Sequence, residues 1–188
     1  MSILTDKKIY KGRPADKRIP KEEAAYDLLE KCGIEFDRVD HAEAMTIEEC
    51  LEVDEILEME ICKNLFLCNS SKTEYYLLLM PGGKKFRTAE VSKQIGSSRL
   101  SFASYDKLEE YLDLTPGSVT VIGLMNDKQN KVRLLIDSDL LGEPLFGCHP
   151  MINTSSVRFK TEDLIKKLLP EMKHNFIEVF LTGEAQDK

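Results

Sequence analysis

Apolar and polar positions along the chain form short alternating runs, separated by segments with the three- to four-residue spacing of helices. Two runs are typical of buried strands, residues 61–68 (ICKNLFLC) and 74–80 (EYYLLLM), with the polar sequence NSSK after the first. Successive side chains of a strand point to opposite faces, and both faces of the first run are mostly apolar, as in a strand covered on two sides. The pattern therefore predicts a central hairpin of two buried strands.

The remaining elements follow from the same periodicities and from residues that cap helices. Further strands are predicted over residues 34–41, 99–104, 119–125, 131–137, 155–159 and 176–181. Helices are predicted over residues 20–33, 46–57, 89–95, 105–112 and 161–169. Strands 119–125 and 131–137 are expected to form a second hairpin, and residues 141–150 are expected to form a loop.

The order of these elements favours one fold class. Single helices are mixed with hairpins and no regular βαβ repeat is present, which indicates an α+β fold with a mixed, mainly antiparallel sheet flanked by helices. A chain of 188 residues is long enough for one hydrophobic core and one domain. Residues 1–18 lack hydrophobic periodicity and are interpreted as an N-terminal arm, which leaves residues 19–188 as the domain.

Charge is distributed unevenly along the chain, whose formal net charge is -7. An acidic protein of this kind is not a non-specific DNA-coating protein, although it can still hold one end of an RNA. Basic residues cluster over residues 7–21 and 84–87, and acidic residues over residues 43–60. Either these clusters are solvated surface, or the basic segments face a polyanion while the acidic helix faces away from it.

Cysteine usage and hydropathy restrict the cellular setting. The five cysteines include no CxxC pair and no zinc-finger spacing, which favours buried free thiols in a reducing compartment, most simply the cytoplasm. We expect no structural metal. No apolar run approaches the roughly 20 residues of a membrane span and no signal peptide opens the chain, so no membrane is expected as a partner.

Three segments carry the candidate chemistry, and the first is the Lys63–Asn64 pair within the predicted strand 61–68. A charged side chain in a buried strand costs free energy unless its ammonium reaches water, a partner or an anion. Two interpretations stay open, namely that Lys63 extends into solvent or that it binds the negative charge of a substrate. Motifs of dinucleotide sites, P-loop NTPases and serine esterases are absent.

The second segment is residues 115–124 (TPGSVTVIGL), where Gly117 and Gly123 would let a ligand approach the backbone and exposed amides could stabilise an oxyanion. The third is residues 146–156 (FGCHPMINTSS), which contains His149, a side chain that can transfer protons near neutral pH. A turn that enters a strand and a structural loop histidine also explain these two patterns, so neither decides the function.

The remaining titratable residues offer less. Asp127 and Asp137 flank the turn of the second predicted hairpin and are expected to stabilise it. His41 and His174 have no recognisable partners in the sequence.

Taken in order, several short segments resemble one known family, the YbaK/prolyl-tRNA synthetase-associated editing domain. These segments are KNLFL, YYLLLM, RLSFAS, PGSVTVIGLMND, LLID and GCHPMINTSS. The resemblance extends from about Ile19 to Leu169 and is greatest to the free-standing prolyl-tRNA editing proteins that act on alanyl-tRNA(Pro). It implies a hydrolase that cleaves the ester between a wrong amino acid and tRNA, with no metal, no cofactor and no covalent nucleophile.

The resemblance also implies a set of site residues. Lys63 would hold the 3′-terminal part of the aminoacyl-tRNA, Asn64 would orient the substrate, and His149 would lie in the pocket; these are the expected catalytic residues. The expected substrate-binding residues are Gly117, Ser118, Gly123, Gly147, Pro150 and Asn153. The implied partners are the 3′ end of tRNA(Pro) and, transiently, prolyl-tRNA synthetase, with no role for DNA.

One position departs from the family pattern. The glycine of the GxxxP element matches Gly117, but its proline is replaced by Val121. A small pocket that admits alanine and excludes the larger proline would explain specificity, and cysteine or another small amino acid stays open as the substrate. A non-catalytic module that binds a tRNA end or a synthetase also stays open. The polar set of Lys63, Asn64, His149 and Asn153 favours an enzyme, because a scaffold has no need for it.

Overall fold

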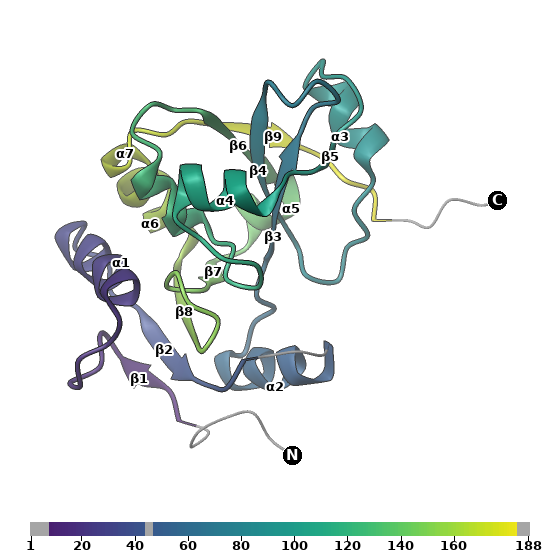
Figure 1. The fold of residues 1–188 in the computed structure, drawn as a ribbon. Helices are drawn as coiled ribbons and strands as arrows, with labels where there is room; N and C mark the ends of the chain where they lie inside the picture. Colours follow the sequence, from purple (N-terminus) through teal and green to yellow (C-terminus); the bar gives the residue numbers. More distant parts are fainter. Residues whose placement is uncertain (1–7, 44–46, 184–188) are drawn as a thin grey trace.

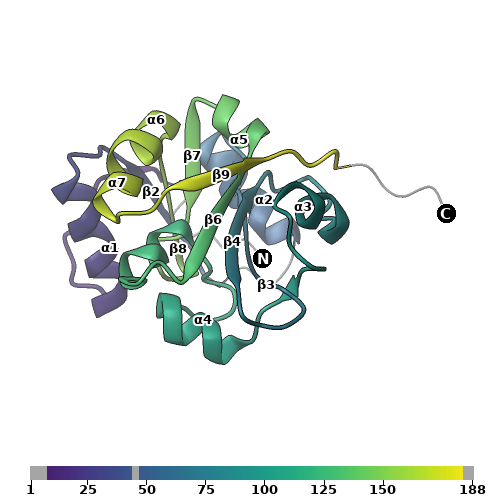
Figure 2. The same ribbon diagram turned by 90° about the horizontal axis from the view of Figure 1, so that it is seen from above.

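The computed structural model describes residues 8–43 and 47–183, and its strands form two sheets (Figures 1 and 2). The four-stranded sheet has the order β1-β2-β8-β7, with bounds Tyr10–Lys11, Asp37–Asp40, Ser155–Lys160 and Leu145–Cys148. The five-stranded sheet has the order β5-β3-β4-β6-β9, with bounds Ser101–Phe102, Lys63–Cys68, Tyr75–Met80, Val132–Asp137 and Phe176–Val179. Among the strand pairings of the described residues, β4–β6 and β6–β9 are parallel and the others are antiparallel. The predicted α+β class with mixed, mainly antiparallel pairing is confirmed, although the strands divide between two sheets.

Helices flank both sheets. The separate helices are α1 (Pro20–Lys31), α2 (Ile47–Leu57), α3 (Thr88–Gln94), α4 (Tyr105–Leu112), the 3-10 helix η1 (Val121–Asn126) and α5 (Ser138–Gly142). A last helix runs continuously through α6 (Thr161–Asp163), the π-turn η2 (Leu164–Leu168) and α7 (Leu169–Glu171). In both views α3 lies on one side of the five-stranded sheet, whereas α1, α6 and α7 lie on the other (Figures 1 and 2). Within the described ranges, no helix is both long and apolar enough to cross a membrane.

The five-stranded sheet has hydrophobic side chains packed on both faces. From β3, Phe66 and Cys68 join the larger core together with residues of α1, α4 and η1. Leu67, which points the other way, joins a smaller core together with Val91 of α3. This arrangement confirms that the strand predicted from residues 61–68 is covered on two sides.

The central hairpin has the predicted partners. β3 and β4 pair antiparallel, with Lys63 opposite Met80 and Cys68 opposite Tyr75. The turn between them is held by Asn69, whose side-chain oxygen accepts hydrogen bonds from the backbone nitrogens of Thr73 (2.9 Å) and Glu74 (3.3 Å). Lys63 therefore stands at the first position of its strand, at the end of the sheet.

The second predicted hairpin is wrong. Residues 119–125 were expected to form a strand, but the chain forms η1, which begins where the hydroxyl of Thr120 accepts a hydrogen bond from the nitrogen of Ile122. The four residues from Val121 to Leu124 are all buried, and a continuous apolar run does not distinguish a buried strand from a short buried helix. β6 instead pairs in parallel with β4 and β9.

Two short strands lie where none was predicted. β7 falls within the predicted loop 141–150 and pairs with β8, with Phe146 opposite Phe159. β1 falls within the predicted arm, residues 1–18, and pairs with β2. Such short strands offer too few alternating positions to be recognised in a sequence.

Basic residues of both clusters bind carboxylates of the same chain. The guanidinium of Arg13 lies 2.8–3.1 Å from three acids of α1, which are Glu23, Asp27 and Glu30. Arg18 pairs with Asp40 at 2.8 Å, and Lys84 pairs with Asp137 at 3.0 Å. The interpretation that the basic segments face a polyanion is therefore wrong for Arg13, Arg18 and Lys84.

Candidate active site

A cavity of about 390 Å³, which we call the pocket, lies between α2, the start of β3, the loop after β4 and the connection from β7 to β8. Its polar lining consists of His41, Asp54, Glu60, Lys63, His149, Asn153 and Ser156. Among the nine predicted site residues, the pocket brings together Lys63, Gly117, His149 and Asn153. Asp54 of α2 lines the pocket, so at least one acid of the predicted acidic helix faces the site.

Lys63 is exposed, and no acid among the described residues neutralises its ammonium. Its Nζ donates a hydrogen bond to the backbone carbonyl of Lys84 at 3.1 Å. No carboxylate in the described part of the chain forms an ion pair with it. The ammonium therefore reaches water at the end of the strand, and it also lines the pocket, where an anion could approach it.

Asn64 does not line the pocket, and its side chain contacts Cys62, which does. Its side-chain nitrogen donates to the carbonyl oxygen of Cys62 (3.2 Å) and lies 3.4 Å from the sulfur of Cys62. Its side-chain oxygen is buried and has no hydrogen-bond partner within the described residues. In this conformation Asn64 supports Cys62, a residue of the pocket lining.

The hydrogen bonds of His149 determine its tautomer. Its Nδ1 lies 2.9 Å from the carbonyl oxygen of Ser155 and 3.3 Å from the hydroxyl of Ser156. Because a carbonyl oxygen only accepts, Nδ1 carries the proton and Nε2 of the neutral ring keeps a lone pair. Burial lowers the pKa of His149 below its usual value near 6.5. At neutral pH the side chain is thus a neutral imidazole with an accepting nitrogen.

His41 is a pocket residue that the sequence did not indicate. It follows β2, and its Nδ1 lies 2.7 Å from the carbonyl oxygen of Ala42, so Nδ1 donates there. The hydroxyl of Ser156 is 2.9 Å from His41 Nε2 and must therefore donate to it. Burial lowers the pKa of His41 as well. The ring centroids of His41 and His149 are 6.0 Å apart, which makes Ser156 a link between two neutral histidines.

Gly117 and Asn153 meet at another part of the pocket. Gly117 has φ +84°, a left-handed conformation that strains other residues, and an added Cβ would lie 3.3 Å from the side-chain nitrogen of Asn153. Ser118 is buried beside it, and its hydroxyl donates to the carbonyl oxygen of Thr115 at 2.9 Å. Ser118 therefore closes the turn that presents Gly117 and does not line the pocket itself.

The other predicted substrate-binding residues lie outside the pocket lining. Gly123 is part of η1, and a Cβ there would lie 2.6 Å from a methyl carbon of Leu114 in the core. Gly147 lies on β7, where a Cβ would contact the side chain of Met59 at 3.1 Å. Pro150 is buried next to His149. These positions shape the structure around the pocket.

Two acids were also missed. The carboxylate of Asp54 accepts a hydrogen bond from the backbone nitrogen of Ile61 at 2.9 Å and so joins α2 to the segment before β3. Burial raises the pKa of Asp54. Glu60 lies against the loop after β4, with its carboxyl group about 3 Å from the place of a Cβ on Gly82 or Gly83. In the sequence they are only two members of a run of acids, so no signal singled them out.

Cys62 lines the pocket but is a poor nucleophile. Its thiol is buried and donates to the carbonyl oxygen of Gly147 at 3.4 Å. Burial raises its pKa well above the usual value for a thiol, and nearby Cys148 adds to this. Burial also raises the pKa of Cys148 to about 12. Thiols with raised pKa values are not ionised at neutral pH and react slowly.

The described residues contain no group of three or more histidine, cysteine, aspartate or glutamate side chains placed to hold a metal ion.

The two aspartates that were assigned to the turn of the second predicted hairpin have different partners. Asp127 accepts hydrogen bonds from the nitrogens of Lys131 (2.9 Å) and Val132 (2.7 Å), so it does stabilise its turn. Asp137 is fully buried and pairs with Lys84.

Comparison with known proteins identifies the family. The family model for the aminoacyl-tRNA editing domain matches residues 41–167. The chain is 34% identical over 145 residues to the prolyl-tRNA editing protein ProX of Acetoanaerobium sticklandii, covering 77% of this chain and 88% of the relative. It is 30% identical over 137 residues to the mouse (Mus musculus) prolyl-tRNA synthetase associated domain-containing protein 1, covering 71% and 80%.

A solved structure shows the same fold. The crystal structure of a candidate trans-editing enzyme for prolyl-tRNA synthetase superposes with a TM-score of 0.63 at 17% identity, covering 88% of this chain and 99% of that one. The resemblance seen in the sequence is thereby confirmed. The chain belongs to the aminoacyl-tRNA editing domain family.

Proposed function

We propose that the protein is a trans-editing deacylase that hydrolyses the ester bond of mischarged tRNA(Pro), with alanyl-tRNA(Pro) as its main substrate. One observation carries the proposal. The same pocket contains the Lys63 ammonium, which no acid of the described residues neutralises, and the neutral imidazole of His149, whose Nε2 can accept a proton. The first binds an anion and the second accepts a proton. The name of the relative ProX, a prolyl-tRNA editing protein, supports tRNA(Pro) as the carrier.

The residues of the pocket have distinct roles in the proposed reaction. Lys63 binds the phosphate of the terminal nucleotide, as an ammonium at a pocket mouth does with an anion. Gly117 lets the aminoacyl group approach the backbone, and Asn153 beside it offers an amide for a polar atom of that group. Binding places the ester carbonyl next to His149, and this positioning supplies a large part of the rate.

Hydrolysis then needs one water and one proton acceptor. Nε2 of His149 accepts a proton from the water as its oxygen bonds to the carbonyl carbon, which produces a tetrahedral intermediate and an imidazolium. As the intermediate collapses, the bond from the carbonyl carbon to the ribose oxygen breaks and the imidazolium returns the proton to that oxygen. The products are the free amino acid and tRNA. The vicinal 2′-hydroxyl of the terminal adenosine assists by orienting the water.

Substrate choice follows from size in this proposal. A pocket that fits a small aminoacyl group rejects the larger, cyclic prolyl group sterically. Cysteinyl-tRNA(Pro) is the second candidate substrate, because cysteine is close to alanine in size. Prolyl-tRNA synthetase is the proposed transient partner, since its product is the substrate that has to be spared; co-migration of the two proteins tests this contact.

The test is the release of amino acid from alanyl-, cysteinyl- and prolyl-tRNA(Pro) by the purified protein. We expect rapid release of alanine, slower release of cysteine and no release of proline above the spontaneous rate. Binding of tRNA(Pro) without hydrolysis of any of the three would instead support the non-catalytic module.

A further inference from the structure

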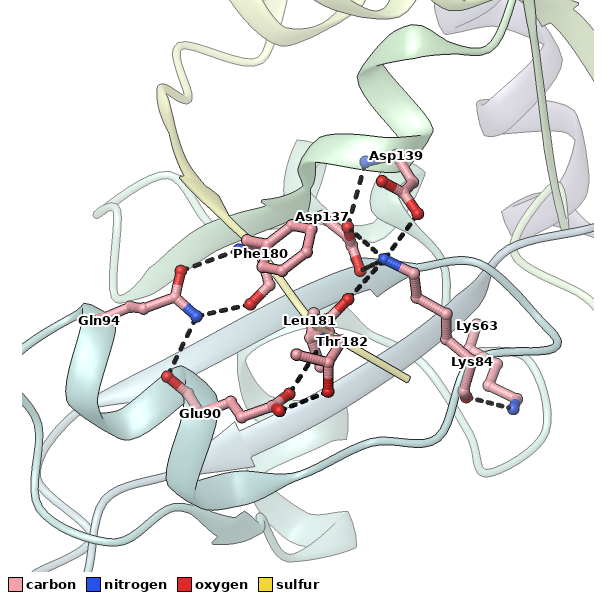
Figure 3. A network of polar contacts seen from close by, with 9 residues as sticks. All are labelled: Lys63, Lys84, Glu90, Gln94, Asp137, Asp139, Phe180, Leu181 and Thr182. Atoms are coloured by element: carbon pink, nitrogen blue, oxygen red, sulfur yellow. Dashed lines mark hydrogen bonds and ion pairs between the residues drawn. The ribbon is translucent and has the colours of Figure 1, made fainter. Parts of the chain in front are cut away.

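Lys84 and Lys85 are neighbours in the GGKKFR sequence, but they have different environments. Lys85 is exposed, whereas the side chain of Lys84 is only 15% exposed. The ammonium of Lys84 lies 3.0 Å from each carboxylate oxygen of Asp137, 2.8 Å from Asp139 and 2.7 Å from the carbonyl oxygen of Leu181 (Figure 3). The three hydrogens of the ammonium are thus used within the protein.

The groups that hold Lys84 come from separate parts of the fold. Asp137 ends β6, is fully buried and caps α5 by accepting from the nitrogen of Asp139 at 3.1 Å. Leu181 follows β9, and the ring of Phe180 lies 5.4 Å from the Lys84 ammonium. The loop that carries Lys84 is therefore fastened to β6, α5 and the chain after β9 at once.

The same loop forms a wall of the pocket. Gly82 and Gly83 line the pocket, and a Cβ on Gly82 would lie 2.8 Å from the carbonyl oxygen of Ile61. The loop thus packs directly against the segment that precedes β3. Two residues after Gly82 in the same loop, the backbone carbonyl oxygen of Lys84 accepts the hydrogen bond from Nζ of Lys63 (Figure 3).

We propose that Lys84 is a positioning residue for Lys63. Its side chain fixes the loop, so its own carbonyl oxygen holds one N–H of the Lys63 ammonium and leaves the other two for an anion. The inference rests on the proposed function, in which the anion is the phosphate of the terminal nucleotide.

The main variant has to remain folded. Lys84→Met alone would leave the buried carboxylate of Asp137 uncompensated, so it is combined with Asp137→Asn, which keeps an oxygen to cap α5. Lys84→Arg is the conservative variant that keeps the charge. Gln94→Ala is the matched control, because Gln94 of α3 binds the backbone of Phe180 at 2.6 and 2.8 Å and so holds the same C-terminal segment from another element (Figure 3).

Two readouts separate positioning from folding. The first is kcat on alanyl-tRNA(Pro). The second is the ratio of Kd for adenosine to Kd for adenosine 5′-monophosphate, measured by NMR titration. This ratio reports the preference for a phosphate and does not depend on the fraction of folded protein. For the wild type we expect a ratio of roughly ten, the size of one charge-assisted hydrogen bond, and a ratio near one for Lys63→Ala.

The inference predicts that Lys84→Met/Asp137→Asn has a ratio near one and a kcat lowered roughly 10- to 100-fold, as expected for a misplaced group. Lys84→Arg should recover most of both values, and Gln94→Ala should match the wild type. Three results would each overturn the inference. The double variant could keep the ratio of the wild type, Gln94→Ala could lose as much of the ratio and of kcat as the double variant, or the wild type itself could show no preference for phosphate. Absence of hydrolysis by the wild type, with the predicted ratios intact, would instead remove the proposed function.

Discussion

The imidazole rings of His41 and His149 lie 6.0 Å apart at the pocket, and the hydroxyl of Ser156 is within hydrogen-bond distance of both. Both rings donate through Nδ1 to a backbone carbonyl, and burial lowers both pKa values. The pocket therefore holds two neutral histidines, and Nε2 of His149 carries a lone pair. This feature makes the rate and the stability depend on pH in a defined direction.

Deacylation should be fastest where His149 is neutral. Since burial lowers its pKa below 6.5, the rate should be constant above about pH 6.5 and should fall only at lower pH, as the proton occupies Nε2. His149→Gln should lower kcat by roughly 10²- to 10⁴-fold and abolish the acid limb of the profile. The measurement is kcat against pH for both proteins, corrected for spontaneous hydrolysis of the ester. An unchanged acid limb in His149→Gln would assign it to another group.

Stability should also fall on the acid side of neutrality. The unfolded chain binds protons at its histidines with the ordinary pKa, whereas the folded state binds them only at the lowered pKa values. The free energy of unfolding that the two neutral histidines contribute is fully present above about pH 6.5. It is lost as the pH falls through the lowered pKa values. Urea unfolding at several pH values measures this. His41→Gln should lose less stability on acidification than the wild type; identical slopes would contradict the account.

Cys62 should be dispensable although it lines the pocket. Its raised pKa and its hydrogen bond to Gly147 keep it protonated at neutral pH. Cys62→Ala should therefore keep deacylation within about threefold of the wild type, since an alanine removes little volume at this site. Iodoacetamide at pH 7.5 should leave the native enzyme active. Rapid inactivation that Cys62→Ala prevents would show a reactive thiol in the pocket.

Gly82→Ala and Gly147→Ala form a matched pair. A methyl group on Gly82 would lie 2.8 Å from the backbone oxygen of Ile61, which cannot move without shifting the segment before β3. A methyl group on Gly147 would lie 3.1 Å from the end of the Met59 side chain, which can rotate away. We expect Gly82→Ala to lower the free energy of unfolding by about 1–3 kcal/mol and to reduce deacylation, and Gly147→Ala to change both little.

The pair also tests an expectation drawn from the sequence. Gly147 was predicted to bind substrate, yet it lies outside the pocket lining. If Gly147→Ala kept its stability and lost activity, substrate would contact β7, and the binding site would extend beyond the residues that line the pocket. Melting temperatures and kcat values of the two variants are the measurements.

Local patterns were enough to predict the central hairpin and its two covered faces. Residues 63–68 and 75–80 carry a strong strand pattern, and a polar turn joins them. Lys63 was identifiable for a physical reason, because a charge interrupted an apolar run. The apolar run from Val121 to Leu124 was ambiguous, since every side chain in it is buried in the short helix that it forms.

What the sequence did not show depends on contacts between distant residues. His41 reaches the pocket because its backbone nitrogen donates to the carbonyl oxygen of Thr154 at 3.0 Å, which places it beside Ser156. Lys84 resembled a surface base because its carboxylate partner, Asp137, lies 53 residues further along the chain. Neither relationship leaves a local pattern, so both required the fold.

The most direct test of the account is the rate at which Lys63→Ala releases alanine from alanyl-tRNA(Pro). Lys63 is exposed, and among the described residues its Nζ bonds to a single carbonyl oxygen, so the variant should melt within about 2 °C of the wild type. Lys131→Ala, which removes an exposed lysine outside the pocket, is the control for net charge. We predict that Lys131→Ala is as active as the wild type and that Lys63→Ala is no faster than spontaneous hydrolysis. Wild-type deacylation by well-folded Lys63→Ala would contradict the central claim.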